Sequence, residues 1–256
     1  MRVIAAALGV LVVVGVAVAG TIPGVTVLPK PGFPAPAKDV KPTGARLVLV
    51  SSAPHDAATL PPERPEPPPW APRRFKGDDL QVVIRQGGKL FFLYGPDAAS
   101  GRHLLGADAR TQEIRYAFDF TAFASPPHGG WFEPVTWARE VGRTLYVSNS
   151  HLTYASATKG RNAYVSAIDL RTRTTLWRSH ALVANARTFI ATGDLIVAGY
   201  GFTREPDFLY LLDRRTGKAL DRLEVPTAPE VIKLRRAHLH VRTYDHDLVV
   251  RIAGTG

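Results

Sequence analysis

Short apolar runs, each bounded by turn-forming residues, recur along the larger, C-terminal part of the chain. Runs of this kind predict β-strands. Four of them carry a Leu at their second position; they are residues 89–94, 144–148, 194–198 and 238–242. The matching leucines, at intervals of 55, 50 and 44 residues, are Leu90, Leu145, Leu195 and Leu239. The chain is therefore predicted to be an all-β protein built from about four repeats.

A short polar motif, Asp-x-Arg-Thr, occurs three times, each time between two apolar runs. An Asp at the start of a tight turn accepts hydrogen bonds from backbone N–H groups two or three residues later. The residue after the Thr is then expected to have a positive φ, which Gly adopts without strain. Only the third copy has Gly there, so we expect the first two turns to be strained or of another type. The predicted turn residues are Asp108, Thr111, Asp169, Thr172, Asp213, Thr216 and Gly217.

The repeat length is typical of the four-stranded blades of a β-propeller. We therefore predict a small β-propeller of about four four-stranded blades over residues 80–256. The fourth repeat stops before its last strand, and an isolated apolar run at residues 46–50 has no partner nearby. We predict that residues 46–50 supply the missing strand and close the ring, which would remove an open sheet edge. The alternative is a partial ring that closes by self-association or on a partner.

The second copy of the turn motif extends to Ala-x-Asp-x-x-Thr-x-x-x-x-Trp, ending at Trp177. This resembles the docking motif of pyrroloquinoline-quinone (PQQ)-like β-propeller proteins, with only the Gly after the Thr missing. The third copy has Asp221 in place of the Trp and the first has Tyr116. In that family the Trp packs against the neighbouring blade, so the resemblance implies such a contact for Trp177. The family includes quinoprotein dehydrogenases and non-enzymatic envelope scaffolds.

The N-terminal region differs in composition from the repeats. Met1 and Arg2 precede an uncharged stretch that runs to Leu28, typical of a secretory signal peptide. Because the stretch is also long enough to cross a bilayer, residues 1–28 could instead be an uncleaved membrane anchor. Either alternative predicts an exported protein whose body lies in the periplasm or outside the cell, touching the membrane only through this segment.

Residues 29–79 contain about thirteen of the 21 prolines of the chain. Proline fixes φ and removes a hydrogen-bond donor, so this region is predicted to be an extended linker that holds the propeller away from the membrane.

The chain has no cysteine, which excludes disulfides, a thiolate zinc site and a lipid-anchor cysteine.

The formal net charge is +10, with basic residues scattered and no long run of like charges. We expect no nucleic-acid binding, because no basic helix face or basic run is present. An unidentified protein or an anionic polymer of the cell envelope is the partner that we expect.

Two groups of residues are candidates for ligand or metal binding. The loop between the first two repeats contains His128 and Trp131 beside a Gly pair, which could form a ligand loop. Three histidines, His238, His240 and His246, lie close together near the C-terminus. His238 and His240 are two residues apart on one predicted strand, so they share a face of it. Two imidazoles on one face can hold a metal if a third ligand arrives, although a polar strand face is the interpretation that we favour.

The sequence contains no catalytic pattern. Ser150, His151 and Lys159 lie near one another in the sequence, but there is no Gly-x-Ser-x-Gly elbow and no carboxylate at a defined spacing. We therefore expect no enzyme activity, no metal and no cofactor. The hypothesis is a non-enzymatic, exported β-propeller that serves as a protein- or polymer-binding scaffold. Alternatives are a ligand-sensing or glycan-binding module on a proline stalk, and a quinoprotein-type oxidoreductase.

Overall fold

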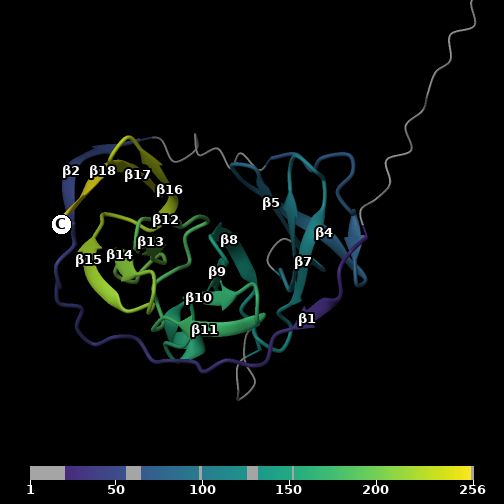
Figure 1. Cartoon of the computed structure of the whole chain (residues 1–256). Helices are drawn as coiled ribbons and strands as arrows, with labels where there is room; N and C mark the ends of the chain where they lie inside the picture. The colour runs from purple at the N-terminus through teal and green to yellow at the C-terminus, as the bar shows by residue number, and fades with distance from the viewer. Residues whose placement is uncertain (1–20, 56–64, 98–99, 126–131, 152, 255–256) are drawn as a thin grey trace, which may run out of the picture.

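The structure is a computed structural model, and it describes residues 21–55, 65–97, 100–125, 132–151 and 153–254. These residues form four β-sheets that follow one another along an arc (Figure 1). A single 3-10 turn, η2 (Ala155–Thr158), interrupts the strands of the described part. No helix in the described ranges has the length and apolarity needed to span a membrane. The chain is a small β-propeller of four blades, as predicted.

Each blade is a meander of four antiparallel strands, with its first strand innermost. The first contains β4 (Asp78–Gln86), β5 (Lys89–Gly95), β6 (His103–Asp108) and β7 (Ile114–Asp119), flanked by β3 (Arg74–Phe75) and β1 (Val25–Val27). The second contains β8 (Val135–Val141), β9 (Thr144–Asn149), β10 (Tyr164–Asp169) and β11 (Thr174–Arg178). The third contains β12 (Ile190–Thr192), β13 (Leu195–Tyr200), β14 (Phe208–Asp213) and β15 (Ala219–Glu224). The fourth contains β16 (Pro229–Arg235), β17 (His238–Thr243), β18 (His246–Ala253) and β2 (Arg46–Pro54).

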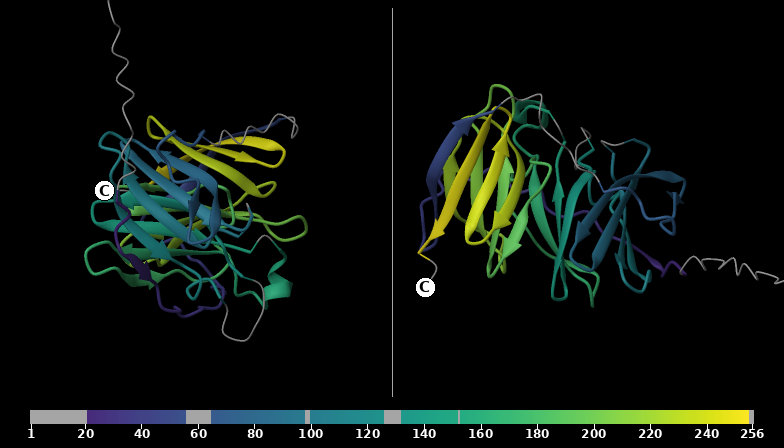
Figure 2. Two further views of the ribbon diagram at one scale, coloured as in Figure 1. Left: turned by 90° about the vertical axis from the view of Figure 1, so that its right-hand side faces the viewer. Right: turned by 90° about the horizontal axis from the view of Figure 1, so that it is seen from above.

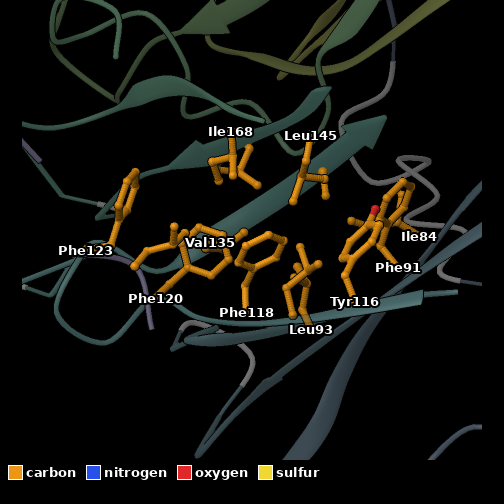
Figure 3. Close-up of a cluster of buried hydrophobic side chains, with 14 residues drawn as sticks. Ile84, Phe91, Leu93, Tyr116, Phe118, Phe120, Phe123, Val135, Leu145 and Ile168 are labelled. Atoms are coloured by element: carbon orange, nitrogen blue, oxygen red, sulfur yellow. The ribbon is translucent and has the colours of Figure 1, made fainter. Parts of the chain in front are cut away.

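Buried apolar side chains fill the space between consecutive blades. Figure 3 shows the cluster between the first and second blades, where Phe91 and Tyr116 face Leu145. A second cluster joins the second blade to the third, and a third cluster joins the third blade to the fourth. Every strand alternates its side chains between the two sheet faces, so an inner blade contributes to two clusters at once. These interfaces hold the blades in their order.

The first and fourth blades lie at opposite ends of the arc (Figures 1 and 2). Among the described residues, no apolar cluster contains side chains from both. The outer face of the first blade is instead covered by residues 70–75, where Trp70 packs edge-on against Phe92 with ring centroids 5.5 Å apart. Tyr94 donates a hydrogen bond of 2.9 Å to the carbonyl oxygen of Pro72. Residues 70–75 therefore serve as a cover for the first blade.

The isolated strand of the sequence completes the fourth blade, as predicted. β2 pairs antiparallel with β18 over its whole length, and Leu47 enters the cluster between the third and fourth blades. The backbone N–H of Leu47 also donates a buried hydrogen bond of 2.6 Å to Oδ2 of Asp221. The strand completes the sheet without bringing the fourth blade against the first. The prediction that this strand closes the ring was therefore wrong. In a closed ring the fourth blade would cover the outer face of the first blade, but residues 70–75 cover that face instead.

Residues 21–54, which we call the belt, run along the outer edges of all four blades (Figure 1). β1 pairs in parallel with β7, Pro36 forms a bridge with Ala181, and the N–H of Thr43 donates to the carbonyl oxygen of Leu220 over 3.0 Å. The belt then becomes β2. Because unpaired sheet edges attract other strands, the belt also protects the outer edges of the blades.

The belt changes two expectations for the N-terminal region. Residues 21–28 belong to the predicted signal peptide or anchor, but β1 is a strand and Leu28 is fully buried. Residues 29–45 belong to the predicted linker of residues 29–79, which was expected to be extended and to hold the propeller away from the membrane. Phe33 instead packs against Tyr164 with ring centroids 5.9 Å apart, and the Tyr164 hydroxyl donates to the carbonyl oxygen of Pro34. An extended proline-rich chain keeps its carbonyl acceptors free, which allows this docking. Residues 1–20, the core of the predicted signal, lie outside the described part.

The turn between the first two strands of each blade gives the correct alignment of the repeats. In every blade two residues separate the paired strand ends, and the first of them has a positive φ; these residues are Gly87, Gly142, Gly193 and Arg236. Counted from the turn, Leu90, Leu145 and Leu239 are equivalent, but their partner in the third blade is Ile196. The match that included Leu195 was wrong by one residue, because the first position of β13 is the apolar Leu195, whereas the other three blades have a polar residue there.

Candidate functional site: the outer face of the fourth blade

The turn alignment identifies one strand position that faces the following blade. In the first three blades it is occupied by Phe91, Tyr146 and Val197, all of which are buried in the interblade clusters. In the fourth blade the same position is His240, whose side chain is exposed. Its neighbour Leu239 points the other way into the core. The fourth blade therefore has one apolar face and one polar face.

The first strand of the fourth blade also has an exposed polar residue where other blades have a buried one. Ile84 and Ile190 are buried at equivalent positions of the first and third blades, and the second blade has Arg139, which donates to the carbonyl oxygen of Phe189 over 2.7 Å. The equivalent residue of the fourth blade is Lys233, which is exposed. Burial of a Lys against another blade would carry a large desolvation cost. This face is therefore suited to contact with water or with an anionic partner.

The polar side chains of the face form rows across the sheet. Lys233 pairs in register with His240, and the next row places Arg235, His238 and Arg251 side by side. We call this surface the basic face; it comprises Lys233, Arg235, His238, His240, Arg242, Asp247 and Arg251. Four of these residues are cationic and one is acidic, so the face carries three net positive charges without the histidines.

A groove of about 380 Å³ crosses the basic face. At one side of the groove Arg242 binds Asp247 through two hydrogen bonds of 2.7 and 2.8 Å. These hydrogen bonds lower the pKa of Asp247, so the carboxylate stays ionised and is occupied by Arg242. Lys233, Arg235 and Arg251 form no ion pair with any residue that the structure describes. Three cationic side chains are thus available to a partner.

The three C-terminal histidines are not brought together. His238 and His240 share the basic face, as their spacing indicated, but the His246 ring lies 2.7 Å from a carboxylate oxygen of Asp245. Within the described ranges, no cluster of three or more His, Asp or Glu side chains has the arrangement of a metal site.

The three Asp-x-Arg-Thr turns have the predicted hydrogen bonds. Oδ1 of Asp108 and of Asp169 each accepts two backbone N–H bonds of 2.7 to 2.9 Å, and Oδ1 of Asp213 accepts from the N–H and the hydroxyl of Thr216. The residues after the Thr, Gln112, Arg173 and Gly217, have φ values of 61°, 58° and 71°. All three turns share one conformation, which is strained only where the residue is not Gly. These turns have a structural role, because each joins the third strand of its blade to the fourth.

The last position of each motif copy lies in the strand after the turn and contacts the next blade. The Trp177 indole lies over Gly217 of the third blade, so closely that a side chain at Gly217 would overlap the ring. Tyr116 donates 2.7 Å to Oε2 of Glu140 in the second blade, and Asp221 accepts from Leu47 in the fourth. The contact that the resemblance implied for Trp177 is therefore present.

Two loop predictions have different outcomes. His128 and Trp131 lie outside the described residues, so the predicted ligand loop stays a prediction. Ser150 and His151 lie at a loop in which the Ser150 hydroxyl donates to the carbonyl oxygen of His151, and the N–H of His151 donates to Asn162. These contacts stabilise the loop backbone.

A buried contact between Arg178 and Glu133 under the belt was not predicted from the sequence. Arg178 and Glu133 are 3.4 Å apart, and the guanidinium lies over the rings of Phe33, Phe123 and Tyr164 at 4.2 to 4.9 Å. Burial raises the pKa of Glu133 to about 8, although the charge of Arg178 opposes the shift. Burial also lowers the pKa of Arg178 to about 10. Arg178 joins the belt to the second blade through its contact with Phe33, and only the folded chain brings these distant residues together.

A second groove, of about 530 Å³, lies between belt residues 37–43 and the second and third blades. Its lining includes Asp39 and Lys41 from the belt, and His180 and Lys218 from the blades. Both charge signs are present in it. The groove therefore lacks the single-sign character of the basic face.

No family model matches the chain, and no curated protein matches it. Several solved structures are similar to the chain, all at low identity and with TM-scores below 0.5. BamB from Moraxella catarrhalis is 14% identical with a TM-score of 0.46, and the match covers 68% of this chain and 44% of that one. The β-propeller domain of Myceliophteria thermophila Cps50 (Swd1) is 18% identical with a TM-score of 0.40, covering 67% and 53%. The computationally designed Ika4 is 11% identical with a TM-score of 0.42, covering 69% and 91%. The chain spans less than half of the Moraxella protein that it matches.

Proposed function

We propose that the protein is an exported, non-enzymatic scaffold of the PQQ-like type that binds a protein or an anionic polymer of the cell envelope. The observation that carries this proposal is the outer face of the fourth blade. At positions where other blades bury Phe91 and Val197, this blade exposes His240, and it exposes Lys233 where they bury Ile84 and Ile190. An end blade with a polar outer face does not need another blade to cover it. Its charge makes it a surface for an anionic partner.

The contact between Trp177 and Gly217 supports the PQQ-like assignment, because it is the interblade contact that the motif resemblance implies. The uncharged N-terminal stretch after Arg2 supports export. A propeller blade is a rigid support, and rigid elements hold binding side chains in fixed positions. These features together favour a binding role on the far side of the cytoplasmic membrane.

The experiment is co-sedimentation of the purified full chain with an isolated envelope fraction. The test variant is Lys233→Glu/Arg235→Glu, in which both changed residues are exposed on the basic face. The matched control is Arg171→Glu/Arg215→Glu, which makes the same charge change at exposed turn positions of the second and third blades. We expect wild type and control to sediment with the envelope and the test variant to remain in the supernatant. Equal sedimentation of both variants would refute the role of the basic face.

The non-enzymatic part of the proposal has its own check. An absorbance spectrum and a native mass are measured on the protein purified from its own envelope. We expect the mass of the polypeptide with no chromophore. A bound quinone chromophore would contradict this part and favour the quinoprotein-type alternative.

A further inference from the structure

We infer that the basic face binds an extended, phosphate-bearing polymer, with the phosphates of successive units lying on successive rows of cationic side chains. This inference rests on the proposed function and narrows its partner to one chemical class. The partner is a phosphodiester-linked polymer of sugars or polyols.

The geometry of the sheet provides a regular array of positive charge. Neighbouring strands are about 4.8 Å apart, and side chains on one face of a strand repeat about every 6.8 Å. Lys233 and His240 form one row, and Arg235, His238 and Arg251 form the next. Both rows lie on strands of one sheet, so an extended chain that lies along the strands meets both of them. A single phosphate ion would meet only one.

The side chains are suited to phosphate groups. Arg presents a planar fork of donors that binds two phosphate oxygens at once, and two Arg lie in one row on either side of His238. Asp247, the acidic residue of the basic face, is already bound to Arg242 at 2.7 and 2.8 Å. The repulsion that a carboxylate would exert on an approaching anion is therefore largely neutralised.

The same face is poorly suited to nucleic acid. Proteins that bind single strands without sequence preference stack the bases on aromatic side chains. The groove is lined by aliphatic residues between the charged ones, such as Val231 and Val249, and its described lining contains no Phe, Tyr or Trp. Small aliphatic side chains fit the CH groups of a sugar or polyol backbone. A second copy of this chain is disfavoured as the occupant, because its own net charge is +10.

The inference is tested by fluorescence anisotropy with a labelled inorganic polyphosphate chain as the probe, added to the full-length protein. Unlabelled polyphosphate, polyglutamate of matched charge and single-stranded DNA compete for the site. We expect polyphosphate to compete at least tenfold better than polyglutamate or DNA. Lys233→Glu/Arg235→Glu should weaken binding at least tenfold, and Arg171→Glu/Arg215→Glu should leave it within twofold of wild type. Circular dichroism of both variants verifies that they are folded.

Salt dependence supplies a second readout. Each lost phosphate contact lowers the slope of log K against log salt concentration by roughly 0.7 for a single-stranded polyanion. We therefore expect the slope of Lys233→Glu/Arg235→Glu to be smaller by about 1.4 than that of wild type. An equal loss of affinity in both double variants would overturn the site, because it would show attraction by net charge alone.

Failure of the inference can be distinguished from failure of the proposed function. If polyglutamate competes as well as polyphosphate, phosphate preference is overturned while a scaffold for acidic proteins remains. If polyphosphate does not bind but the envelope fraction still retains wild type and not the test variant, the polymer class is wrong and the face is right. If neither the probe nor the envelope binds, both proposals are wrong.

Discussion

The replacement of Gly217 by Ala is predicted to destabilise the fold by forcing the second and third blades apart. Gly217 has a φ of 71°, in the left-handed region that favours Gly. An added Cβ would lie 2.7 Å from Cζ3 and 2.9 Å from Cδ2 of the Trp177 indole, and nearer still to Cε3. Carbon atoms in van der Waals contact are about 3.5 to 4.0 Å apart. The indole or the turn must therefore move.

Two costs add at this position. A residue with a Cβ in the left-handed region costs about 1 kcal/mol relative to Gly. Overpacking of a close contact costs about 1 to 3 kcal/mol. The free energy of unfolding of Gly217→Ala should therefore be lower than that of wild type by about 2 to 4 kcal/mol.

The measurement is urea unfolding followed by far-ultraviolet circular dichroism, arranged as a double-mutant cycle with Trp177→Leu. Removal of the indole relieves the overlap, so Gly217→Ala should cost only about 1 kcal/mol in the Trp177→Leu background. Gln112→Gly is the matched control, because Gln112 has a φ of 61° at the equivalent turn and is exposed. It should stabilise the protein by about 0.5 to 1 kcal/mol. Equal costs of Gly217→Ala in both backgrounds would refute the interblade contact as the cause.

Three further predictions concern the belt and the buried polar groups. Asp221→Ala leaves the buried N–H of Leu47 without its acceptor and should cost about 1 to 3 kcal/mol in urea unfolding, whereas Asp221→Asn, which keeps an acceptor, should cost clearly less. Phe33→Ala removes the belt's buried aromatic anchor and should cost about 3 kcal/mol, with faster amide hydrogen exchange in residues 29–45; unchanged exchange there would contradict the docking of the belt. The pKa of Glu133 is raised from 4.5 to about 8 in the folded chain. Between these two pH values the carboxyl group is therefore protonated in the folded chain and ionised in the unfolded chain. The contribution of Glu133 to the free energy of unfolding is therefore largest below pH 4.5. It decreases as the pH rises towards 8, by at most about 1.4 kcal/mol per pH unit. Glu133→Gln cannot titrate, so the stability of wild type relative to this variant should fall between pH 5 and pH 8; parallel pH profiles of the two proteins would contradict the shift.

The strands and hairpin turns of this protein could be predicted because they depend on local sequence. The Asp of each turn binds N–H groups only two or three residues away, so the motif alone specifies the hydrogen bonds around Asp108 and Asp169. The pairing of β2 with β18 is non-local, but it was still predictable. A strand without a partner and a blade without its last strand point to each other.

The belt was not predictable in the same way. Its contacts join residues far apart in the sequence, such as Pro34 and Tyr164, and a proline-rich composition describes a free linker equally well. The burial of Phe33 and of the Arg178–Glu133 pair depends on the position of the second blade. Such contacts follow from tertiary packing, and neither composition nor periodicity reports it.

The basic face was recognised only in part. The spacing of His238 and His240 predicted that they share a strand face. Only the alignment of the blades shows that His240 occupies a position that is buried in the other three blades. Leucine matching placed Leu195 one residue out of register, and this hid the equivalence of His240 with Val197. The turn residues Gly193 and Arg236, both with positive φ, give the alignment that a sequence comparison of the repeats should use.

Thiol labelling at the basic face is the most direct test of the account, because the chain has no natural cysteine. The measured quantity is the maleimide reaction rate of His240→Cys in the folded full chain, with and without the isolated envelope fraction. Val197→Cys supplies the buried reference at the equivalent position, and Glu113→Cys supplies an exposed site on the first blade. We predict that His240→Cys reacts as fast as Glu113→Cys in the free protein and that the envelope fraction slows only His240→Cys. A His240→Cys thiol as protected as Val197→Cys in the free protein, or one whose rate the envelope leaves unchanged, would contradict the account.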